Sequence, residues 1–344
     1  MSKHVILEDG NTKFLVSRDI KSYFDKRTGF TATWGVTKDD DPDWCEFGPL
    51  LLDVELSTAC SQGCDMCYKS NRSVGKHMTL EQFQAIFAKL PNTLTQIAFG
   101  LGNTPNLDGT PGNPDCLEIF DYCRSQGVIP NATVNGFGLD KATAERLAGV
   151  LGACAVSRYN PKDVCYDAVR LLTEAGLVQT NVHMLTSLET FGDCLELLSD
   201  AKTDPRLANL HAIVFLSAKQ KGRGTWLTPL PQEQYSVLVQ EALESGVRFG
   251  FDSCGAWKFM DAVKDHPNYE LYKTLAEPCE SGLFSLYIDV RGACYPCSFS
   301  DDAVEGIDIN RVDDFMEEVW LSEGIKRWRA ALLANGRKCP IFKV

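Results

Sequence analysis

Three cysteines lie within eight residues in the stretch CSQGCDMCY, directly after the apolar run LLDVELSTA. Cys60, Cys64 and Cys67 are separated by three residues and then by two. A structural zinc ion takes four protein ligands, usually from two Cys-x2-Cys pairs, so three thiols on one loop leave a metal site open. An iron–sulfur cluster held by three thiolates keeps one iron free. The spacing therefore predicts an open iron–sulfur site, with a zinc knuckle or incidental thiols as the alternatives.

The other cysteines fall into two classes among the fourteen in the chain. Five lie near the C-terminus and are candidate metal ligands: Cys254, Cys279, Cys294, Cys297 and Cys339. Six are scattered through apolar patterns and are expected to be small buried side chains: Cys45, Cys116, Cys123, Cys154, Cys165 and Cys194. Because a reducing compartment keeps thiols free, clustered thiols in a leaderless chain of this size more often bind metal than form disulfides.

Composition narrows the class of protein. The chain has 344 residues, of which 44% are hydrophobic and 23% charged, as in soluble globular proteins. No apolar stretch reaches the roughly 20 residues that cross a bilayer, and the N-terminus lacks the pattern of a signal peptide. The net charge of -12 and the absence of a dense basic run make nucleic acid an unlikely partner. We therefore expect a cytoplasmic protein that binds neither membranes nor nucleic acid.

Strand-like and helical patterns alternate from about residue 51 to residue 253. The expected strands are 51–56, 95–100, 130–136, 154–159, 179–185, 211–217 and 247–253. Helical patterns lie between them, and three of these end in a glycine suited to a left-handed cap. Six strand–helix repeats predict parallel strands in an open, partial α/β barrel, because a closed barrel needs eight. Ligands of such sheets bind at the carboxyl ends of the strands, which is where the three-cysteine loop falls.

Two further segments flank the barrel. Residues 1–48 are expected to form a short extension rich in β-strands, and 49–253 the partial barrel. Residues 254–344 break the alternation and are expected to form a small α+β, cysteine-rich extension, with two short strands joined by a turn at Val290-Arg291-Gly292.

The Cys-x3-Cys-x2-Cys spacing, followed by an aromatic residue, resembles the signature of the radical S-adenosylmethionine (AdoMet) superfamily. The resemblance implies a 4Fe-4S cluster on Cys60, Cys64 and Cys67, with AdoMet on the open iron and a 5′-deoxyadenosyl radical formed from it. It also places Tyr68 near the adenine. The family's glycine-rich turn after the second strand reads FGLGNTPN here, which assigns Gly100, Gly102 and Asn103 to the AdoMet amino group. This turn departs from the usual pair of adjacent glycines followed by an acid.

Polar residues near strand ends are further candidates for the cofactor site. Asn135, Asn181, His183 and Lys219 are expected at the catalytic rim, together with Ser157 for the ribose hydroxyls and Arg158 for the AdoMet carboxylate. The alternative for each is a polar side chain that satisfies strand-end backbone. No acid–base residue is assigned, and Asp252 and Glu280 are expected to be structural.

The C-terminal cysteines resemble a second family feature. Cys279, followed after twelve residues by Gly292 and after four more by Cys297, is similar to the opening of the SPASM/twitch extension, which carries auxiliary 4Fe-4S clusters. Cys339 is similar to a closing ligand. The resemblance implies one auxiliary cluster, with Cys254 or Cys294 as the fourth ligand. We favour Cys254 because it follows the last barrel strand.

An auxiliary cluster implies chemistry that alters the oxidation state of the substrate. We expect a radical AdoMet enzyme that modifies a peptide or protein and draws electrons from a reductant such as flavodoxin or ferredoxin. One alternative is the same chemistry on a nucleoside, sugar or other small metabolite, and another is a non-catalytic metal-binding protein. The first 48 residues are too few for the winged-helix module that grips leader peptides in related enzymes.

Overall fold

The computed structural model describes residues 3–344. Seven strands run parallel and lie side by side in chain order: β5 (Leu51–Glu55), β6 (Gln96–Gly100), β7 (Ile129–Val134), β8 (Cys154–Ser157), β9 (Thr180–Thr186), β10 (Ala212–Ser217) and β11 (Phe249–Phe251). No described pairing joins β11 back to β5. The barrel is therefore open, as the six strand–helix repeats predict.

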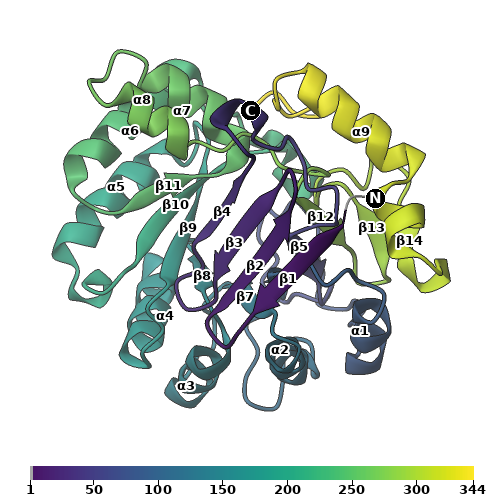
Figure 1. Cartoon of the computed structure of the whole chain (residues 1–344). Helices are drawn as coiled ribbons and strands as arrows, with labels where there is room; N and C mark the ends of the chain where they lie inside the picture. The colour runs from purple at the N-terminus through teal and green to yellow at the C-terminus, as the bar shows by residue number, and fades with distance from the viewer. Residues whose placement is uncertain (1–2) are drawn as a thin grey trace.

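A helix follows each of the first six of these strands, and the helices cover the outer side of the sheet (Figure 1): α1 (Leu80–Phe87), α2 (Cys116–Ser125), α3 (Lys141–Val150), α4 (Lys162–Glu174), α5 (Phe191–Thr203) and α6 (Gln232–Ser245). The start of α1 is fixed by a capping box between Thr79 and Gln82. The three predicted capping glycines, Gly127, Gly176 and Gly246, all have positive φ.

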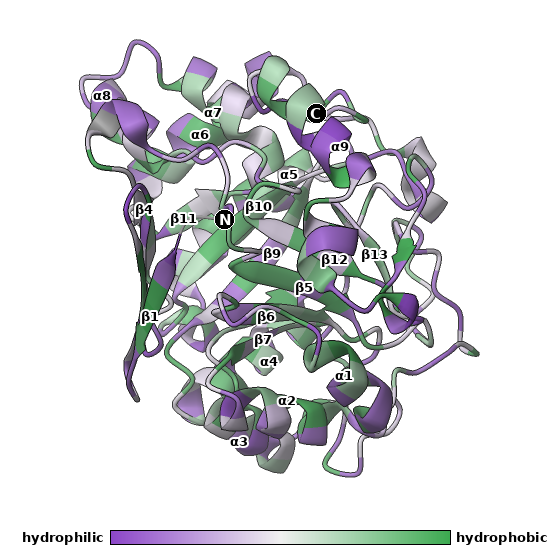
Figure 2. Cartoon of the chain, turned by 45° about the vertical axis from the view of Figure 1, so that its right-hand side comes forward, coloured by the Kyte–Doolittle hydropathy of each residue, from purple (hydrophilic) through white to green (hydrophobic). Residues whose placement is uncertain are grey.

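The main core lies between the sheet and these helices. Leu52, Ile97 and Val182 are fully buried strand residues that face the helices, and each burial contributes about 2 kcal/mol. Figure 2 shows this as hydrophobic colour concentrated on the strands, while the outer surfaces of helices such as α3 are hydrophilic. The six scattered cysteines are all buried, which confirms their prediction as small core side chains.

A separate antiparallel sheet, which we call the N-terminal sheet, precedes the barrel. Its strands pair in the order β1 (His4–Glu8), β2 (Thr12–Ser17), β3 (Lys21–Asp25) and β4 (Thr31–Trp34). It lies across the front of the barrel in Figure 1, on the side that the helices leave open. The Lys13 ammonium donates to the Leu94 carbonyl at 2.8 Å, just before β6, and Gln179 donates to the Thr28 carbonyl just before β9. The sheet is thus tied to both halves of the barrel.

The C-terminal part extends the barrel sheet. It comprises α7 (Ala256–Ala262), α8 (Tyr269–Leu275), β12 (Ser285–Ile288), β13 (Ala293–Tyr295), β14 (Ile307–Asp308) and α9 (Glu323–Ala334). Strand β12 pairs in parallel with β5 and then antiparallel with β13 across the predicted turn. The sheet therefore has ten strands and is continuous across the predicted boundary at 253/254. The division into three domains stays a prediction.

The remaining regular segments are short. They are 3₁₀ turns at Lys38–Asp40, Pro205–Leu207, Gly222–Trp226, Ser253–Gly255 and Ile309–Arg311, and a π-helical turn at Met316–Trp320. Among residues 3–344, none of the helices combines the length and apolar character needed to cross a membrane.

Candidate metal centres

The three-cysteine loop follows β5 at the carboxyl end of the parallel strands. Its thiols are free and half-buried. The loop turns back at Gly63, whose φ of 60° suits glycine, and the Cys67 amide donates to the Cys64 carbonyl at 3.2 Å. Burial and then the neighbouring thiols of Cys60 and Cys67 raise the pKa of Cys64. Three thiols therefore face one region without forming a disulfide.

The donor set of this loop fits a cluster better than a single ion. Within residues 3–344, no three His, Cys, Asp or Glu side chains converge as ligands of one metal ion. A four-iron cluster spaces its thiolates further apart, because each thiolate binds a different iron. Three thiols without a fourth protein ligand are the set that leaves one iron open.

A 3₁₀ turn after β10 clamps the cysteine loop. The Arg223 guanidinium donates to the carbonyls of Cys64 at 2.9 Å and Asn71 at 2.8 Å, and the Trp226 indole donates to the Asp65 carbonyl at 3.1 Å. Sequence reasoning missed both residues. The available signal was KGRGTW, a glycine-flanked arginine directly after the sixth predicted strand.

The glycine-rich turn after β6 packs directly on the cysteine loop. Gly100 ends β6. Gly102 has a φ of 75°, and a Cβ there would lie 2.5 Å from the Ala59 carbonyl oxygen. Its own carbonyl lies 3.4 Å from the Cys60 sulfur and accepts from Asn135 at 3.1 Å. Asn103 accepts from the Ser61 amide at 3.1 Å. Asn103 therefore joins the glycine-rich turn to the cysteine loop, and Asn135 ties the same turn to the end of β7.

At the end of β8 the structure separates two residues that were predicted together. The Arg158 guanidinium lies 3.2 Å from the Glu196 carboxylate of α5 and stacks over Tyr166 of α4, on the outer side of the barrel. Adjacent residues of a strand point to opposite faces, so Arg158 cannot share the site of Ser157. The structure instead places Tyr159 on the side of the cysteines, hydrogen-bonded to Ser157. Sequence reasoning missed Tyr159, although the same alternation would have found it.

Asn181 also departs from its expected place at the rim. It is the second residue of β9 and pairs with Ala155 of β8 and Ala212 of β10, so it lies at the start of its own strand rather than at the strand end. Its side-chain oxygen is buried and has no hydrogen-bond partner among the described residues. His183 lies in mid-strand, and burial lowers its pKa to about 4. Neither residue is brought together with the three-cysteine loop.

Asp252 accepts hydrogen bonds from three residues in two segments and is structural, as expected. Its carboxylate accepts from the Ser217 hydroxyl at 2.7 Å, the Lys219 ammonium at 2.5 Å and the Gly255 amide at 3.0 Å. Lys219 is buried just past β10 and also hydrogen-bonds Cys254. This pair therefore orders the backbone around the first C-terminal cysteine.

Tyr68 lies between the barrel and the C-terminal part. Its ring stacks on Phe299 with centroids 4.4 Å apart, and burial raises its pKa. Its predicted contact with adenine stays a prediction. The stack brings the end of the three-cysteine loop next to the segment that follows Cys297.

Four C-terminal cysteines come together from four segments. Burial raises the pKa of Cys254, and the nearby thiols of Cys279 and Cys339 raise it further. Burial also raises the pKa of Cys297, and Cys279 contributes in the same direction. Backbone amides point at two of the sulfurs, from Phe299 to Cys297 at 3.5 Å and from Phe342 to Cys339 at 3.3 Å. Such N–H donors stabilise thiolates that ligate iron–sulfur clusters. The group fits an auxiliary cluster.

Cys294 lies apart from this group. It is fully buried in β13, paired with Ile288 and Ile307 on the neighbouring strands. No other cysteine is among the charges that shift its pKa, which burial raises. Its placement favours Cys254 as the fourth member of the C-terminal group.

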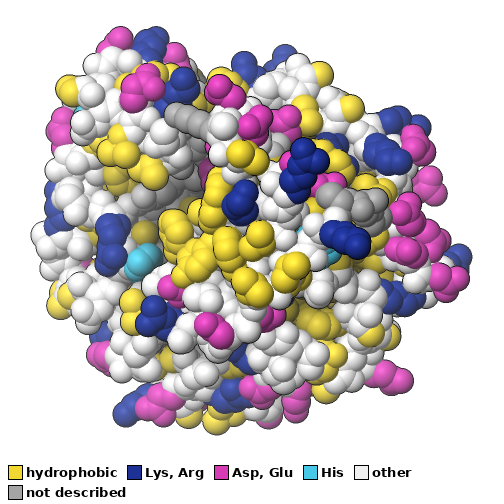
Figure 3. Space-filling view, viewed as in Figure 1, with side chains coloured by type: hydrophobic (Ala, Val, Ile, Leu, Met, Phe, Trp, Pro, Cys, Tyr) yellow, Lys and Arg dark blue, Asp and Glu magenta, His cyan; other side chains and the backbone are white. Residues whose placement is uncertain are grey.

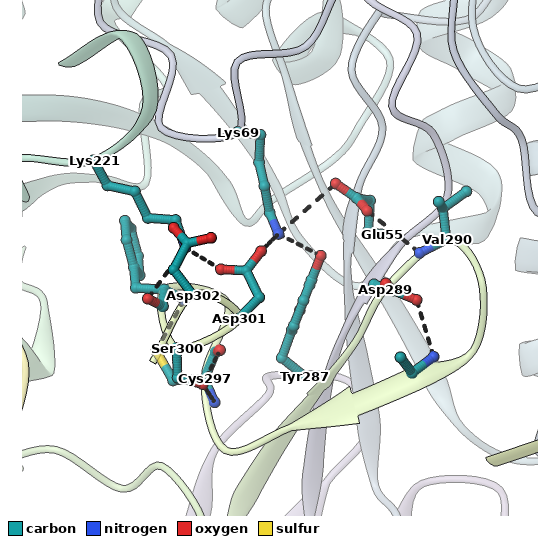
Figure 4. A network of polar contacts seen from close by, with 12 residues as sticks. Glu55, Lys69, Lys221, Tyr287, Asp289, Val290, Cys297, Ser300, Asp301 and Asp302 are labelled. Atoms are coloured by element: carbon teal, nitrogen blue, oxygen red, sulfur yellow. Dashed lines mark hydrogen bonds and ion pairs between the residues drawn. The ribbon is translucent and has the colours of Figure 1, made fainter. Parts of the chain in front are cut away.

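An ion-pair network, shown in Figure 4, joins the two cysteine regions. The Lys69 ammonium, two residues after Cys67, lies 2.6 Å from the Tyr287 hydroxyl, 3.3 Å from Asp301 and 3.9 Å from Glu55. Lys221 pairs with Asp301 from the other side. The lysine side chains are only 12% and 9% exposed. The network therefore locks the first cysteine loop, the β10 loop and the segment after Cys297 to one another.

Two carboxyl groups near the C-terminal group lack a cationic partner at ion-pair distance among the described residues. Burial raises the pKa of Asp53, on β5, to about 6. Burial, followed by the charges of Glu277 and Asp53, raises that of Glu280 to about 7. Carboxyl groups with such values can exchange protons near neutral pH. Glu280 was expected to be structural, and Asp53 was not anticipated.

A cavity of about 610 Å³ lies at the opposite end of the barrel. Its lining includes Gly127, Gly152 and Gly176, which precede strands, together with Arg124 and Gln179. None of the predicted site residues lines it. The candidate site is therefore defined by its thiols rather than by this cavity.

Comparison with known proteins supports the fold. No protein-family model and no curated protein matches the sequence. Among solved structures, Streptococcus suis SuiB bound to S-adenosylmethionine aligns with a TM-score of 0.64 and 13% identity, over 83% of this chain and 68% of SuiB. SuiB bound to its precursor peptide SuiA gives a TM-score of 0.65 with 14% identity, over 81% and 66%. The enzyme anSMEcpe with bound AdoMet and Cp18Cys peptide gives 0.57 with 15% identity, over 81% and 82%.

These likenesses confirm the expected architecture. The chain has the partial barrel of the radical AdoMet fold and spans about two thirds of the length of SuiB. At identities of 13–15%, the comparison supports the fold alone, and any argument about chemistry depends on the residues of the site.

Proposed function

We propose that the protein is a radical AdoMet enzyme that modifies a peptide or protein substrate. The observation that carries the proposal is the three-thiol loop at the end of β5, with the Gly102 turn packed on it, inside this particular fold. Cys60, Cys64 and Cys67 would hold a 4Fe-4S cluster with one open iron. With AdoMet bound, that cluster would supply a 5′-deoxyadenosyl radical able to abstract a substrate hydrogen.

The chain's own residues position and shield this centre. Arg223 and Asn103 fix the backbone on either side of the thiols, so the cluster would be held in a rigid loop. Ser157 and Tyr159 face the same region from β8 and could contact the cofactor.

We further propose that Cys254, Cys279, Cys297 and Cys339 bind one auxiliary 4Fe-4S cluster. Their convergence and the amides directed at Cys297 and Cys339 support this ligand set. A reductant such as flavodoxin or ferredoxin, in a reducing cytoplasmic setting, would supply electrons.

The peptide class of substrate is favoured by two neighbours in fold, SuiB bound to its precursor peptide SuiA and anSMEcpe with bound Cp18Cys peptide. A nucleoside, sugar or other small metabolite is the second candidate, since residues 3–48, as described, form a four-stranded sheet and a short 3₁₀ turn rather than a winged helix.

The direct test is anaerobic reconstitution followed by AdoMet and dithionite, with 5′-deoxyadenosine measured by mass spectrometry. The protein should form 5′-deoxyadenosine, and the Cys60→Ala variant should form none. Absence of the product from the iron-loaded, unmutated protein would instead favour a non-catalytic metal-binding protein.

A further inference from the structure

The outer face of the N-terminal sheet, turned away from the barrel, is apolar. Val5 and Leu7 of β1 are each 57% exposed, Phe30 is 59% exposed and Trp34 of β4 is 37% exposed. Phe14 and Tyr23 lie between them on the two central strands, because Leu7 pairs with Phe14 and Phe14 with Tyr23 across the sheet. The apolar surface therefore runs across all four strands.

The aromatic side chains of this face are already packed together. The Phe14 ring stacks on Trp34 with centroids 5.9 Å apart and meets the edge of Tyr23 at 6.3 Å. Tyr23 in turn lies 6.3 Å from Phe30. Such a ridge loses little side-chain entropy when a partner binds, because its rotamers are held by one another.

No other part of the described chain covers this face. In Figure 2 the sheet stands edge-on at the margin of the molecule, with nothing outside it, and Figure 3 shows hydrophobic side chains gathered over it. An antiparallel sheet with one packed face normally presents polar side chains to water on the other. A contiguous exposed apolar patch is instead typical of an interaction site.

Charge indicates the kind of partner. Residues 3–34 carry six basic and four acidic side chains, in a chain whose net charge is -12. The acids are engaged locally, since Glu8 pairs with Lys26 at 2.6 Å and Asp25 caps the Arg27 amide at 2.8 Å. Lys21, between Val16 and Trp34 on the outer face, has no acidic partner among the described residues. The face thus offers an unpaired cation within an apolar surface.

Size indicates a short partner. Four strands of about five residues cover roughly 300 Å² in projection, with a diagonal of about 25 Å that spans about seven extended residues, whereas a stable protein–protein interface buries about 800 Å² on each side. The face is too small to hold a second copy by itself and large enough for about seven extended residues of a peptide.

We propose that the outer face of the N-terminal sheet binds a short peptide segment that is both apolar and acidic, and that this segment belongs to the substrate polypeptide. The inference rests on the proposed peptide substrate. Apolar side chains would pack on the ridge of Phe14, Tyr23 and Trp34, and a carboxylate would pair with Lys21. The segment would tether the substrate while another part of it enters the barrel.

The test measures binding of two fluorescein-labelled twelve-residue probes to the full-length protein by fluorescence anisotropy. One probe alternates Leu or Phe with Glu, and the other carries Lys in place of every Glu. We expect the Glu probe to bind at least tenfold more tightly, Trp34→Ser to weaken it at least tenfold, and Lys21→Glu to reverse the preference. The matched control Leu275→Ser, which changes an apolar residue 69% exposed on α8, should leave binding unchanged.

Equal binding of the two probes, or unchanged binding to the Trp34→Ser variant with normal circular dichroism, would overturn the inference. So would sedimentation showing a micromolar dimer that Trp34→Ser converts to a monomer, because a second copy would then cover the face. Formation of 5′-deoxyadenosine by the unmutated protein is measured separately. Its failure would reject the proposed function, whereas the probes report on the face alone.

Discussion

Cys60, Cys64 and Cys67 occupy one loop of eight residues, whereas Cys254, Cys279, Cys297 and Cys339 come from four segments spread over 86 residues. The first group is positioned by a single turn and the loops that clamp it. The second exists only after β11, β12 and the tail beyond α9 have packed together. A local group depends on few contacts and a dispersed group on the whole fold, so the two should respond differently to mutation.

The largest expected effect comes from removing the local group. The Cys60/Cys64/Cys67→Ala triple variant should retain about four irons per chain after anaerobic reconstitution, against about eight in the unmutated protein, and should form no 5′-deoxyadenosine. Iron and sulfide analysis measures this. A fall to about zero irons from about four would mean that the dispersed group binds no cluster.

The assignment of the fourth ligand in the dispersed group can be tested by comparing Cys254 with Cys294. Cys254→Ala should lose about four irons per chain, because it removes one of the four converging thiols. Cys294→Ala should keep about eight, because its thiol is buried in β13. Iron analysis with electron paramagnetic resonance of the reduced clusters separates the two. The opposite pattern would make Cys294 the ligand and reject our assignment.

A substitution in the ion-pair network tests whether the two cysteine regions form one structural unit. Lys69→Met leaves Glu55 without its buried cation and Asp301 with Lys221 alone, and should lower the free energy of unfolding by about 3 kcal/mol. Loss of iron to a chelator should accelerate at both groups. As a control, Lys326→Met removes an exposed pair 3.3 Å long and should change stability by less than about 1 kcal/mol. Faster loss from only one group would show that the regions are independent.

The smallest expected effect concerns the barrel interior. Burial lowers the pKa of His183 from 6.5 to about 4, so the unfolded chain binds more protons between these values and stability is lost as the pH falls through them. The difference in unfolding free energy between the unmutated protein and His183→Gln should shift by up to about 3 kcal/mol from pH 7 to pH 4. Urea unfolding at several pH values measures it. A constant difference would show that His183 is accessible to protons.

The elements of the barrel could be predicted because each has a local cause. The alternation of apolar runs and amphipathic helices sets β5 to β11, and the spacing of three thiols marks the loop after β5. Side-chain direction was harder. Ser157 and Arg158 were both assigned to the cofactor, although the alternation of a strand sends one inward and the other to Glu196. Asn181 was misplaced for a different reason, since it lies at the start of β9 rather than its end.

Contacts between distant segments could not be predicted from one sequence. The sequence around Lys69 does not indicate its hydrogen bond to Tyr287. The sequence around Arg223 likewise does not indicate its hydrogen bond to the Cys64 carbonyl. The preference for Cys254 over Cys294 could be drawn from the sequence, but the placement of Cys294 in the core could not. The spacing Cys294-x2-Cys297 suggested chelation, but a strand places Cys294 in the core while Cys297 lies beyond its end.

The parallel pairing of β12 with β5 cannot form until most of the chain has been synthesised. About 230 residues separate the two strands, so at 5–20 residues per second the ribosome takes roughly 10 to 50 s to deliver the partner of β5. During that interval one edge of β5 is unpaired, and Lys69 has neither Tyr287 nor Asp301. The first thiol loop is thus complete in sequence long before Tyr287 and Asp301 lock it in place.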